Sequence, residues 1–252
     1  MFADADLSDD AFLMGRLRLW QPIKGYRAAT DPVLLAAACP AVAGQSVLDL
    51  GCGVGTASLC LAVRVPELAL QGIELQADYA DLARRNAARN SIALTVHDGD
   101  LEAMPNVLKI GFDHVIANPP YYPRAGSPSP ITGRDTALRA EVPLAAWVDA
   151  AARRLLPGGW LTMILGTDGL PEVLAALPPR LGSATVLPLT ARAGQPAQRV
   201  LLRARKGGRA AFRLLSPLIM HDGAAHSGDR NSYAPAAQAV LRDAADLSEF
   251  FG

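Results

Sequence analysis

Short apolar runs recur along the chain, and amphipathic stretches lie between several of them. The runs that predict strands are 45–50, 70–74, 94–97, 113–117, 160–165, 184–189 and 199–205. Helical spacing predicts helices that start near Thr56 and end before Pro66, over 78–90 and over 143–156, the last closed by Pro157-Gly158-Gly159. Apolar strands that alternate with helices are typical of βαβ units, whose strands run parallel. The pattern therefore predicts an α/β protein with a mainly parallel sheet.

The residues before the first of these strands follow other patterns. We expect residues 1–12 to fray at the start, and 13–23 to form an edge strand or hairpin arm, because apolar and basic residues alternate there. Thr30 is expected to cap a helix in which Pro32 takes a first-turn position. Two Gly-containing polar segments, 123–132 and 221–232, are predicted to be mobile loops, the first directly after the corner described below.

A glycine-rich turn, Gly51-Cys52-Gly53-Val54-Gly55-Thr56, follows the first strand directly after Asp49-Leu50. Glycines let the backbone pass close to a ligand at the end of a strand. A dinucleotide fingerprint needs a third glycine where this chain has Thr56, which disfavours a nicotinamide oxidoreductase. The turn therefore suits a nucleoside that carries an amino acid.

Acidic residues close the next two strands. Glu74 stands where an acid can accept both hydroxyls of a ribose, and Asp100 stands where an acid can accept an adenine amino group. Either acid taken singly is an ordinary strand-end residue. Together with Asp49 and the glycine turn, they predict a binding site for an adenosine-containing cofactor.

The fourth strand ends in Asn118-Pro119-Pro120-Tyr121. Neither proline has an N–H for a sheet ladder, so the chain leaves the strand as a stiff, extended corner. This corner presents one amide and one aromatic ring, which suits a planar acceptor with an exocyclic amine. The alternative is a proline-rich turn packed by a tyrosine.

The motifs, in this order, resemble the class I S-adenosylmethionine (SAM)-dependent methyltransferases, a Rossmann-like fold. The corner resembles their amino-methyltransferase signature (the NPPY motif), which serves N6-adenine and N5-glutamine acceptors. Residues 21–27, 30–36 and 139–141 are similar to the bacterial tRNA-valine (adenine-N6)-methyltransferase family, and so is the Arg-rich end with His221 and Tyr233. The resemblance implies a seven-stranded sheet with an antiparallel last strand and helices on both faces. It also implies one domain, with a hairpin and helix over the cofactor pocket (1–44), a catalytic core (45–206) and a basic strand and helix (207–252).

The family implies SAM as cofactor, adenine N6 of an RNA as acceptor, most naturally a tRNA with a single-stranded loop, and an enzyme of the cytoplasm. The catalytic residues it implies are Asn118, Pro119, Pro120 and Tyr121. The cofactor-binding residues are Lys24, Arg27, Thr30, Asp49, Gly51, Gly53, Thr56, Glu74, Asp100 and Asn118. The RNA-binding residues are Tyr122, Arg124, Arg134, Arg139, Arg203 and Arg205.

Charge and cysteine content add little to the prediction of function. Lys and Arg balance Asp and Glu at 24 each, but no acid occurs between Glu172 and Asp222, where arginines accumulate. That segment is either a phosphate-facing patch or ordinary solvated surface. The three cysteines have no metal-ligand spacing, so no metal is expected. No apolar stretch approaches the roughly 20 residues that cross a bilayer, and the acidic N-terminus lacks a signal-peptide pattern.

Other functions stay open at this stage. Release-factor glutamine N5-methyltransferases share the Asn-Pro-Pro-Tyr corner, but they resemble a catalytic domain preceded by a helical domain, whereas about 44 residues with a hairpin-like pattern precede the first strand here. An rRNA guanine-N2 methyltransferase is a further possibility. A non-catalytic SAM- or nucleotide-binding protein is the alternative from a different class.

Overall fold

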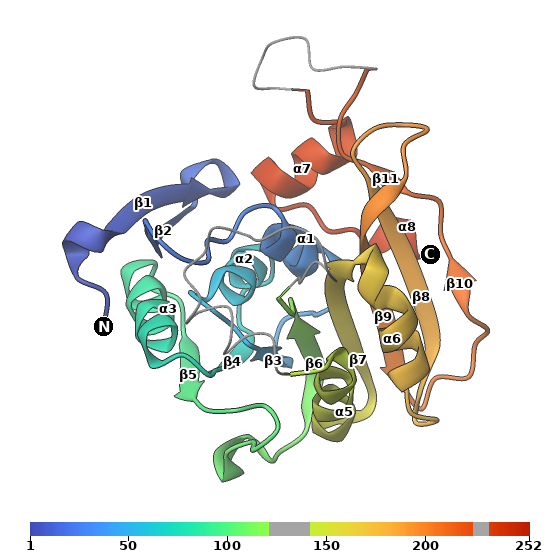
Figure 1. Ribbon diagram of the computed structural model, residues 1–252, viewed down its shortest axis with the longest axis horizontal. Coiled ribbons are helices and arrows are strands. Elements are labelled where there is room, and N and C mark those ends of the chain that lie inside the picture. The colour runs from blue at the N-terminus through green and yellow to red at the C-terminus, as the bar shows by residue number, and fades with distance from the viewer. Residues whose placement is uncertain (121–141, 224–231) are drawn as a thin grey trace.

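The computed structural model describes residues 1–120, 142–223 and 232–252, and a β-sheet flanked by helices forms its centre (Figure 1). The sheet strands are β3 (Ser46–Leu50), β4 (Ala69–Glu74), β5 (Leu94–Asp98), β6 (Phe112–Ala117), β7 (Leu155–Gly166), β8 (Leu181–Thr190), β9 (Ala197–Lys206), β10 (Arg213–Leu214) and β11 (Leu218–Ile219). Their order is β10-β8-β9-β7-β6-β3-β4-β5, and β11 also pairs with β8. The strands from β3 to β7 pair in parallel, whereas β9 runs antiparallel to both β7 and β8.

This topology confirms the predicted fold class. All seven predicted strands are present, and the last of them in sequence, β9, is antiparallel. Strands β10 and β11 contribute two residues each along β8, so the described sheet has nine strands. Two residues are too few to show an alternating apolar pattern, so these two strands could not be predicted.

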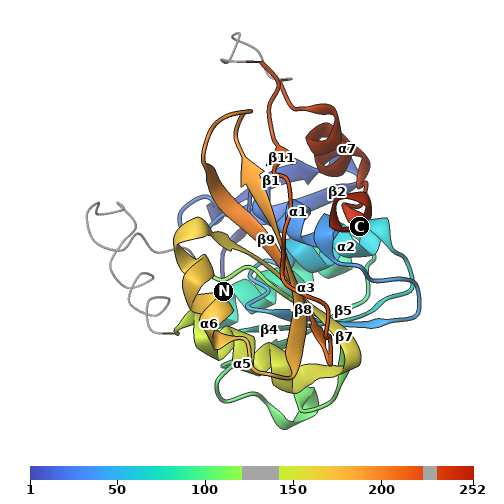
Figure 2. The same ribbon diagram turned by 90° about the vertical axis from the view of Figure 1, so that its right-hand side faces the viewer.

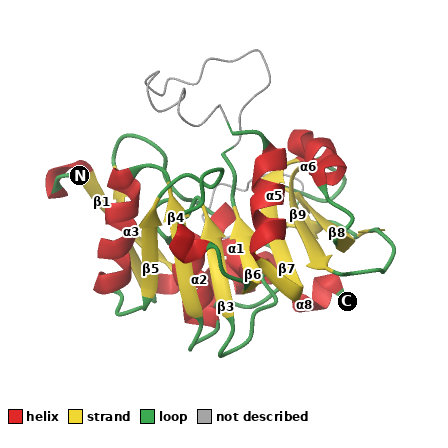
Figure 3. Cartoon of the chain, turned by 90° about the horizontal axis from the view of Figure 1, so that it is seen from below, coloured by secondary structure: helices red, strands yellow, loops and turns green. Residues whose placement is uncertain are grey.

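Helices cover both faces of the sheet, as expected (Figure 3). The helices are α1 (Asp31–Ala38), α2 (Thr56–Arg64), α3 (Ala77–Arg89), α5 (Leu144–Arg154), α6 (Leu170–Ala176), α7 (Pro235–Asp243) and α8 (Ser248–Phe251). Helices α1, α2, α7 and α8 pack on one face, and α5 and α6 pack on the other. Successive strand residues point to opposite faces, so Val47 of β3 lies in one core and Leu48 in the other.

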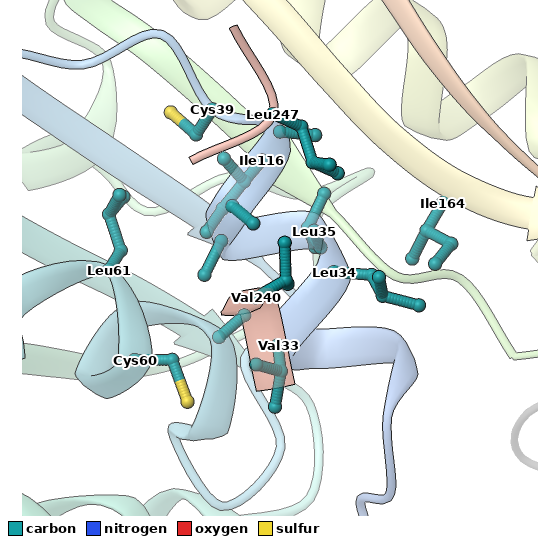
Figure 4. Packing of buried hydrophobic residues seen from close by; sticks show 14 of the residues in the cluster. Val33, Leu34, Leu35, Cys39, Cys60, Leu61, Ile116, Ile164, Val240 and Leu247 are labelled. Carbon is teal, nitrogen blue, oxygen red and sulfur yellow. The ribbon is translucent and has the colours of Figure 1, made fainter. Parts of the chain in front are cut away.

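The core on the α1 face joins distant parts of the sequence. Leu34 and Leu35 of α1 lie among Ile116 of β6, Val240 of α7 and Leu247, as Figure 4 shows. Figure 2 shows the two C-terminal helices beside α1 and α2. The C-terminal segment is therefore part of the main core.

The N-terminal residues form a hairpin of two antiparallel strands, β1 (Leu7–Phe12) and β2 (Leu17–Pro22). The expectation that residues 1–12 fray is therefore wrong from Leu7 onward. Strand β1 has only half-buried and exposed residues, so its own pattern is weak, and its pairing with β2 holds it in place. Figure 1 shows this hairpin beside α3.

Helix α1 begins with Asp31 and Pro32, as predicted, but the Thr30 side chain makes no capping hydrogen bond. Thr30 itself has helical backbone angles, φ −79° and ψ −29°, which do not place its hydroxyl over the first turn. The predicted cap is therefore wrong. The proline needs no N–H partner in the first turn, so the helix starts without it.

The helix predicted over 143–156 is α5, but it ends at Arg154. Pro157, Gly158 and Gly159 belong to the long strand β7. A Cβ at Gly159 would lie 2.7 Å from the Asp113 carbonyl oxygen, so this glycine permits a close strand contact beside a register shift in β6.

No helix in the described part of the chain is both long and apolar enough to cross a membrane. Among residues 1–120, 142–223 and 232–252, no group of three or more His, Cys, Asp or Glu is arranged to hold a metal ion.

Candidate active site

The ends of three parallel strands bring the predicted polar residues to one edge of the sheet. Asp49 lies in β3, Glu74 ends β4, and Asn118 follows directly after β6. Leu50 of β3 pairs with Ala117 of β6, so the glycine turn and Asn118 leave the sheet side by side. Carboxyl ends of parallel strands are the usual binding edge in such sheets.

The glycine turn is shaped for close approach. Gly51, Gly53 and Gly55 have φ of +62°, +57° and +86°, which favours glycine at all three positions. A Cβ on Gly51 would lie 2.6 Å from the Trp147 ring, so this glycine lets the turn pack on α5. A Cβ on Gly53 would meet nothing within 4 Å. The backbone at Gly53 therefore borders open space, where a ligand can approach.

Glu74 fixes this turn from the neighbouring strand. Its carboxylate is buried, and Oε2 accepts the Gly53 N–H at 2.9 Å while Oε1 accepts the Gln76 N–H at 2.9 Å. Each carboxylate oxygen has more than one lone pair, so these bonds leave acceptor capacity toward a ribose. Contact between Glu74 and a ribose stays a prediction.

Asp49 is a buried acid behind the turn. Its Oδ2 accepts a hydrogen bond from Ser58 Oγ on α2 at 2.7 Å. Burial raises the pKa of Asp49 to about 7; the hydrogen bonds from Ser58 oppose the shift, and the charge of Glu74 adds to it. A cation bound nearby would favour the ionised form.

Two further predicted cofactor residues, Thr56 and Asp100, offer polar groups at this edge of the sheet. Thr56 starts α2, and its buried Oγ1 has no hydrogen-bond partner in the described part of the chain. Buried hydroxyls are rarely left without a partner. Asp100 follows β5, where its Oδ1 accepts the Glu102 N–H at 2.8 Å. The Gly99 N–H donates to the Glu74 carbonyl at 3.0 Å, which places this loop beside the end of β4.

Asn118 contacts a tyrosine from the N-terminal segment. Asn118 Nδ2 donates a hydrogen bond to Tyr26 Oη at 3.3 Å. The Tyr26 N–H in turn donates to Tyr79 Oη of α3 at 2.9 Å, and that hydroxyl donates to the Tyr26 carbonyl at 3.4 Å. Tyr26 was not among the predicted site residues. Its one sequence signal is its place in the 21–27 segment, and nothing in the sequence pairs it with Asn118.

The same segment carries the predicted residues Lys24, Arg27 and Thr30. Lys24 is exposed. Arg27 binds the hairpin, because its guanidinium pairs with Asp10 at 2.6 Å and donates to Ser8 Oγ at 2.7 Å. These contacts give Arg27 a structural role, because they bind its segment to β1 of the hairpin. Roles for these three residues at the cofactor stay predictions.

The hairpin is joined to the glycine turn through Asn86 of α3, which sequence reasoning missed. The buried Asn86 Nδ2 donates to the carbonyls of Trp20 in β2 and Val54 in the turn, both at 3.0 Å. A buried Asn in a helix has no distinct sequence signal. Its role follows only from three segments meeting at one side chain.

The rest of the proline corner is described only in part. Pro119 is buried and Pro120 half-buried. Predicted residues in the segment that follows lie outside the described residues: Tyr121, Tyr122, Arg124, Arg134 and Arg139.

The prediction that Arg203 binds RNA is wrong. Arg203 is only 6% exposed, its Nε donates to the Ala38 carbonyl at the end of α1, and its guanidinium lies 3.6 Å from the centre of the Phe251 ring. Burial lowers the pKa of Arg203 to about 10. The side chain therefore holds α1 and the C-terminal helix together and presents no charge to a polyanion.

Arg205 is exposed, but it lies away from the strand ends that form the site. It pairs with Trp160 of β7, which pairs with His114 of β6. His114 is about 10 Å before the carboxyl end of its strand at the usual rise per residue. RNA bound at Asn118 would reach Arg205 only around the sheet edge, and this contact stays a prediction.

Comparison with known proteins agrees with this site. Residues 31–176, more than half of the chain, match the methyltransferase small domain family. A predicted O-methyltransferase from Agrobacterium tumefaciens has the same fold, with a TM-score of 0.69, 26% identity and coverage of 86% of this chain and 98% of that one. The chain therefore belongs to this family and is a SAM-dependent methyltransferase.

Similar proteins of known name indicate which methyltransferases this chain resembles. It is 28% identical over 231 residues to the tRNA1(Val) (adenine(37)-N6)-methyltransferase of Dickeya chrysanthemi, covering 86% of this chain and 87% of that one. It is 33% identical over 174 residues to the enzyme of that name from Porphyromonas gingivalis, covering 65% and 68%. The chain belongs with these proteins in one methyltransferase family, which confirms the resemblance seen in the sequence.

Proposed function

We propose that this protein transfers a methyl group from SAM to the N6 amine of an adenine in tRNA, with adenine 37 of a valine tRNA as the first candidate. The observation that carries the proposal is the position and orientation of Asn118. This residue follows β6 beside the glycine turn, and its Nδ2 is directed to Tyr26. In that orientation the side-chain oxygen Oδ1, a hydrogen-bond acceptor, faces away from Tyr26. The names of the relatives support tRNA as the substrate.

The described residues suit SAM as cofactor. Gly53 gives a ligand access to the backbone, and Glu74 and Asp100 offer acceptors for hydroxyl and amino groups. Thr56 offers a buried hydroxyl in need of a partner, and Asp49 offers a negative charge. When bound, SAM supplies a methyl group on a positively charged sulfur, which is a good leaving group.

Asn118 would prepare the adenine amine. The lone pair of this amine is delocalised into the ring, so it is a weak nucleophile. If the Asn118 Oδ1 and the Pro119 carbonyl accept its two N–H bonds, the lone pair is localised and directed away from both acceptors. Positioning and fixed dipoles supply the rate, and no strong base is needed before transfer. Tyr121 is predicted to stack on the adenine ring.

The adenine must leave its base stack to reach Asn118. Unstacking costs least in a single-stranded loop, so the anticodon loop of a tRNA is a suitable target. Contacts to the RNA backbone are proposed for Arg124, Arg134, Arg139 and the exposed Arg205. Since tRNA is its proposed substrate, we expect the enzyme to work in the cytoplasm.

Methyl transfer to unmodified valine tRNA transcripts tests the proposal. We expect incorporation from labelled SAM into the wild-type transcript and loss of it in a matched transcript with guanine at position 37. Equal labelling of both transcripts would reject this adenine as the acceptor. A release factor and ribosomal RNA are tested in parallel, because methylation of either in place of tRNA would favour the glutamine or guanine alternative. A protein that binds SAM in calorimetry but methylates none of these substrates would favour the non-catalytic alternative.

A further inference from the structure

We infer that Tyr26 is a positioning residue for methyl transfer: its hydroxyl holds the Asn118 amide in the orientation that presents Oδ1 to the acceptor amine. This inference rests on the proposed function and assigns a role to a residue outside the glycine turn and the proline corner. It starts from the hydrogen bond that Asn118 Nδ2 donates to Tyr26 Oη at 3.3 Å.

The orientation of the amide decides whether Asn118 can act. A carboxamide has donors on one side and an acceptor on the other, and rotation by half a turn exchanges them. With Nδ2 toward the acceptor site, two N–H donors would face each other and the amine would lose its partner. A neutral tyrosine hydroxyl can act as donor or acceptor. In this structure it accepts from Asn118 Nδ2, and that orientation leaves Oδ1 on the opposite side of the amide.

Tyr26 can orient Asn118 only if it is itself held in place. Tyr79 Oη bonds both the N–H and the carbonyl of Tyr26, at 2.9 and 3.4 Å. Tyr79 is buried in α3, and its ring meets Phe2 edge-on with the ring centres 5.3 Å apart. The Tyr26 backbone is therefore tied to α3, whereas Asn118 follows β6.

The two residues after Tyr26 are also fixed. The buried Gln21 of β2 accepts the Ala28 N–H at 2.7 Å and donates to the Ala28 carbonyl at 3.2 Å. Arg27 is paired with Asp10 of β1. The hairpin thus holds the two residues that follow Tyr26, which gives the N-terminal residues a part in the chemistry of a group 92 positions away in sequence.

Tyr26→Phe tests this role because it removes the hydroxyl and keeps the ring. The kinetics of methyl transfer to a valine tRNA transcript are measured beside SAM affinity by calorimetry and thermal unfolding. We expect kcat to fall about tenfold, the bias that one ordinary hydrogen bond gives between two orientations, with KM for tRNA and Kd for SAM within about twofold. Tyr233→Phe is the matched control, because it makes the same chemical change beside His221, and it should leave all of these values unchanged.

An unchanged kcat in a folded Tyr26→Phe protein would overturn the inference. So would a parallel loss of SAM binding and melting temperature, since that pattern marks a purely structural role. The side-chain amide resonances of Asn118, identified by their loss in Asn118→Ala, give a second readout that needs no substrate. They should shift in Tyr26→Phe and stay in place in Tyr233→Phe. If the wild type leaves tRNA unmethylated, the proposed function fails, and these resonances still decide whether Tyr26 holds Asn118.

Discussion

Asn86 pairs with both peptide groups of Trp20: its Oδ1 accepts the Trp20 N–H at 2.8 Å, and its Nδ2 donates to the Trp20 carbonyl at 3.0 Å. One turn later, Asn90 directly after α3 pairs with Arg18 of β2 in the same way, at 3.0 and 2.9 Å. Two side-chain amides at helical spacing thus pair with the N–H and carbonyl groups of two alternate residues along one edge of β2, as a neighbouring strand would. Asn86 also bonds Val54, which ties the hairpin to the glycine turn.

Asn86→Ala should therefore destabilise the protein more than Asn90→Ala. The first change leaves the half-buried peptide groups of Trp20 and the buried Val54 carbonyl without their partner, which costs roughly 2–4 kcal/mol, whereas the solvent-accessible Asn90 pair costs about 0.5–1 kcal/mol. For a chain of this size we expect the Asn86→Ala melting temperature to fall by about 5 to 10 °C. Thermal unfolding of both variants checks the difference. Equal losses would mean that Asn86 does not join the hairpin to the turn.

Arg203→Ala should lower stability without changing RNA affinity. It removes the donor to the Ala38 carbonyl and uncovers Phe251, at a cost of about 1–3 kcal/mol. Arg205→Ala, two residues along the same strand, should leave stability within about 0.5 kcal/mol because Arg205 is exposed. Urea unfolding and filter binding to tRNA separate the two effects. Weaker tRNA binding by a stably folded Arg203→Ala protein would contradict the structural role.

SAM affinity should depend on the ionisation of Asp49. With a pKa raised to about 7 by burial, Asp49 is mostly protonated at pH 6 and mostly ionised at pH 7.5. If the charged form attracts the cationic end of SAM, affinity should rise roughly eightfold over this interval, the ratio of the ionised fractions. Calorimetry at both pH values measures it. Asp49→Asn should bind SAM more weakly and with little pH dependence, and an equally steep dependence in that variant would assign the effect to another group.

The same shift has a consequence for stability. The folded-state pKa of Asp49 lies above its unfolded value of 3.8, so folding favours the protonated form. Its contribution to stability is fully present below about pH 4 and is lost as the pH rises through about 7. Above pH 7 without SAM, Asp49→Asn should therefore be at least as stable as the wild type, provided that the amide still accepts the Ser58 hydrogen bond.

Much of the fold follows from local pattern, because β3 to β6 are short strands, β7 contains the apolar run 160–165, and helices lie between most of them. Asp49, Glu74 and Asn118 could be placed together because they stand at the ends of such strands, whose carboxyl ends share one edge. The hydrogen bonds that each residue makes could not be inferred in this way.

The errors occur where distant segments decide the outcome. Arg203 has the sequence context of a surface cation, but in the fold it is buried and lies against Phe251 from the last helix. Strand β1 depends on pairing with β2, and Tyr26 gains its importance from a residue 92 positions later. Thr30 has the identity of a cap but the backbone angles of a helix. None of these relationships has a periodic signature in the chain.

Asn118→Ala should reduce turnover on the order of a hundredfold or more, because the acceptor for the amine is lost in a site built on fixed dipoles. SAM binding should stay within a few-fold, since Asn118 would act on the amine and the glycine turn is unchanged. Single-turnover kinetics and calorimetry with SAM check both parts. Loss of SAM binding together with turnover would indicate that Asn118 supports the fold of the site instead.

Mass spectrometry of the nucleosides from valine tRNA treated with the enzyme and methyl-labelled SAM tests the central claim most directly. We predict labelled N6-methyladenosine from the wild-type reaction, and almost none from the reaction with Asn118→Ala. Label in methylguanosine, or in protein with no label in tRNA, would contradict the assignment of Asn118 as the group that receives an adenine amine.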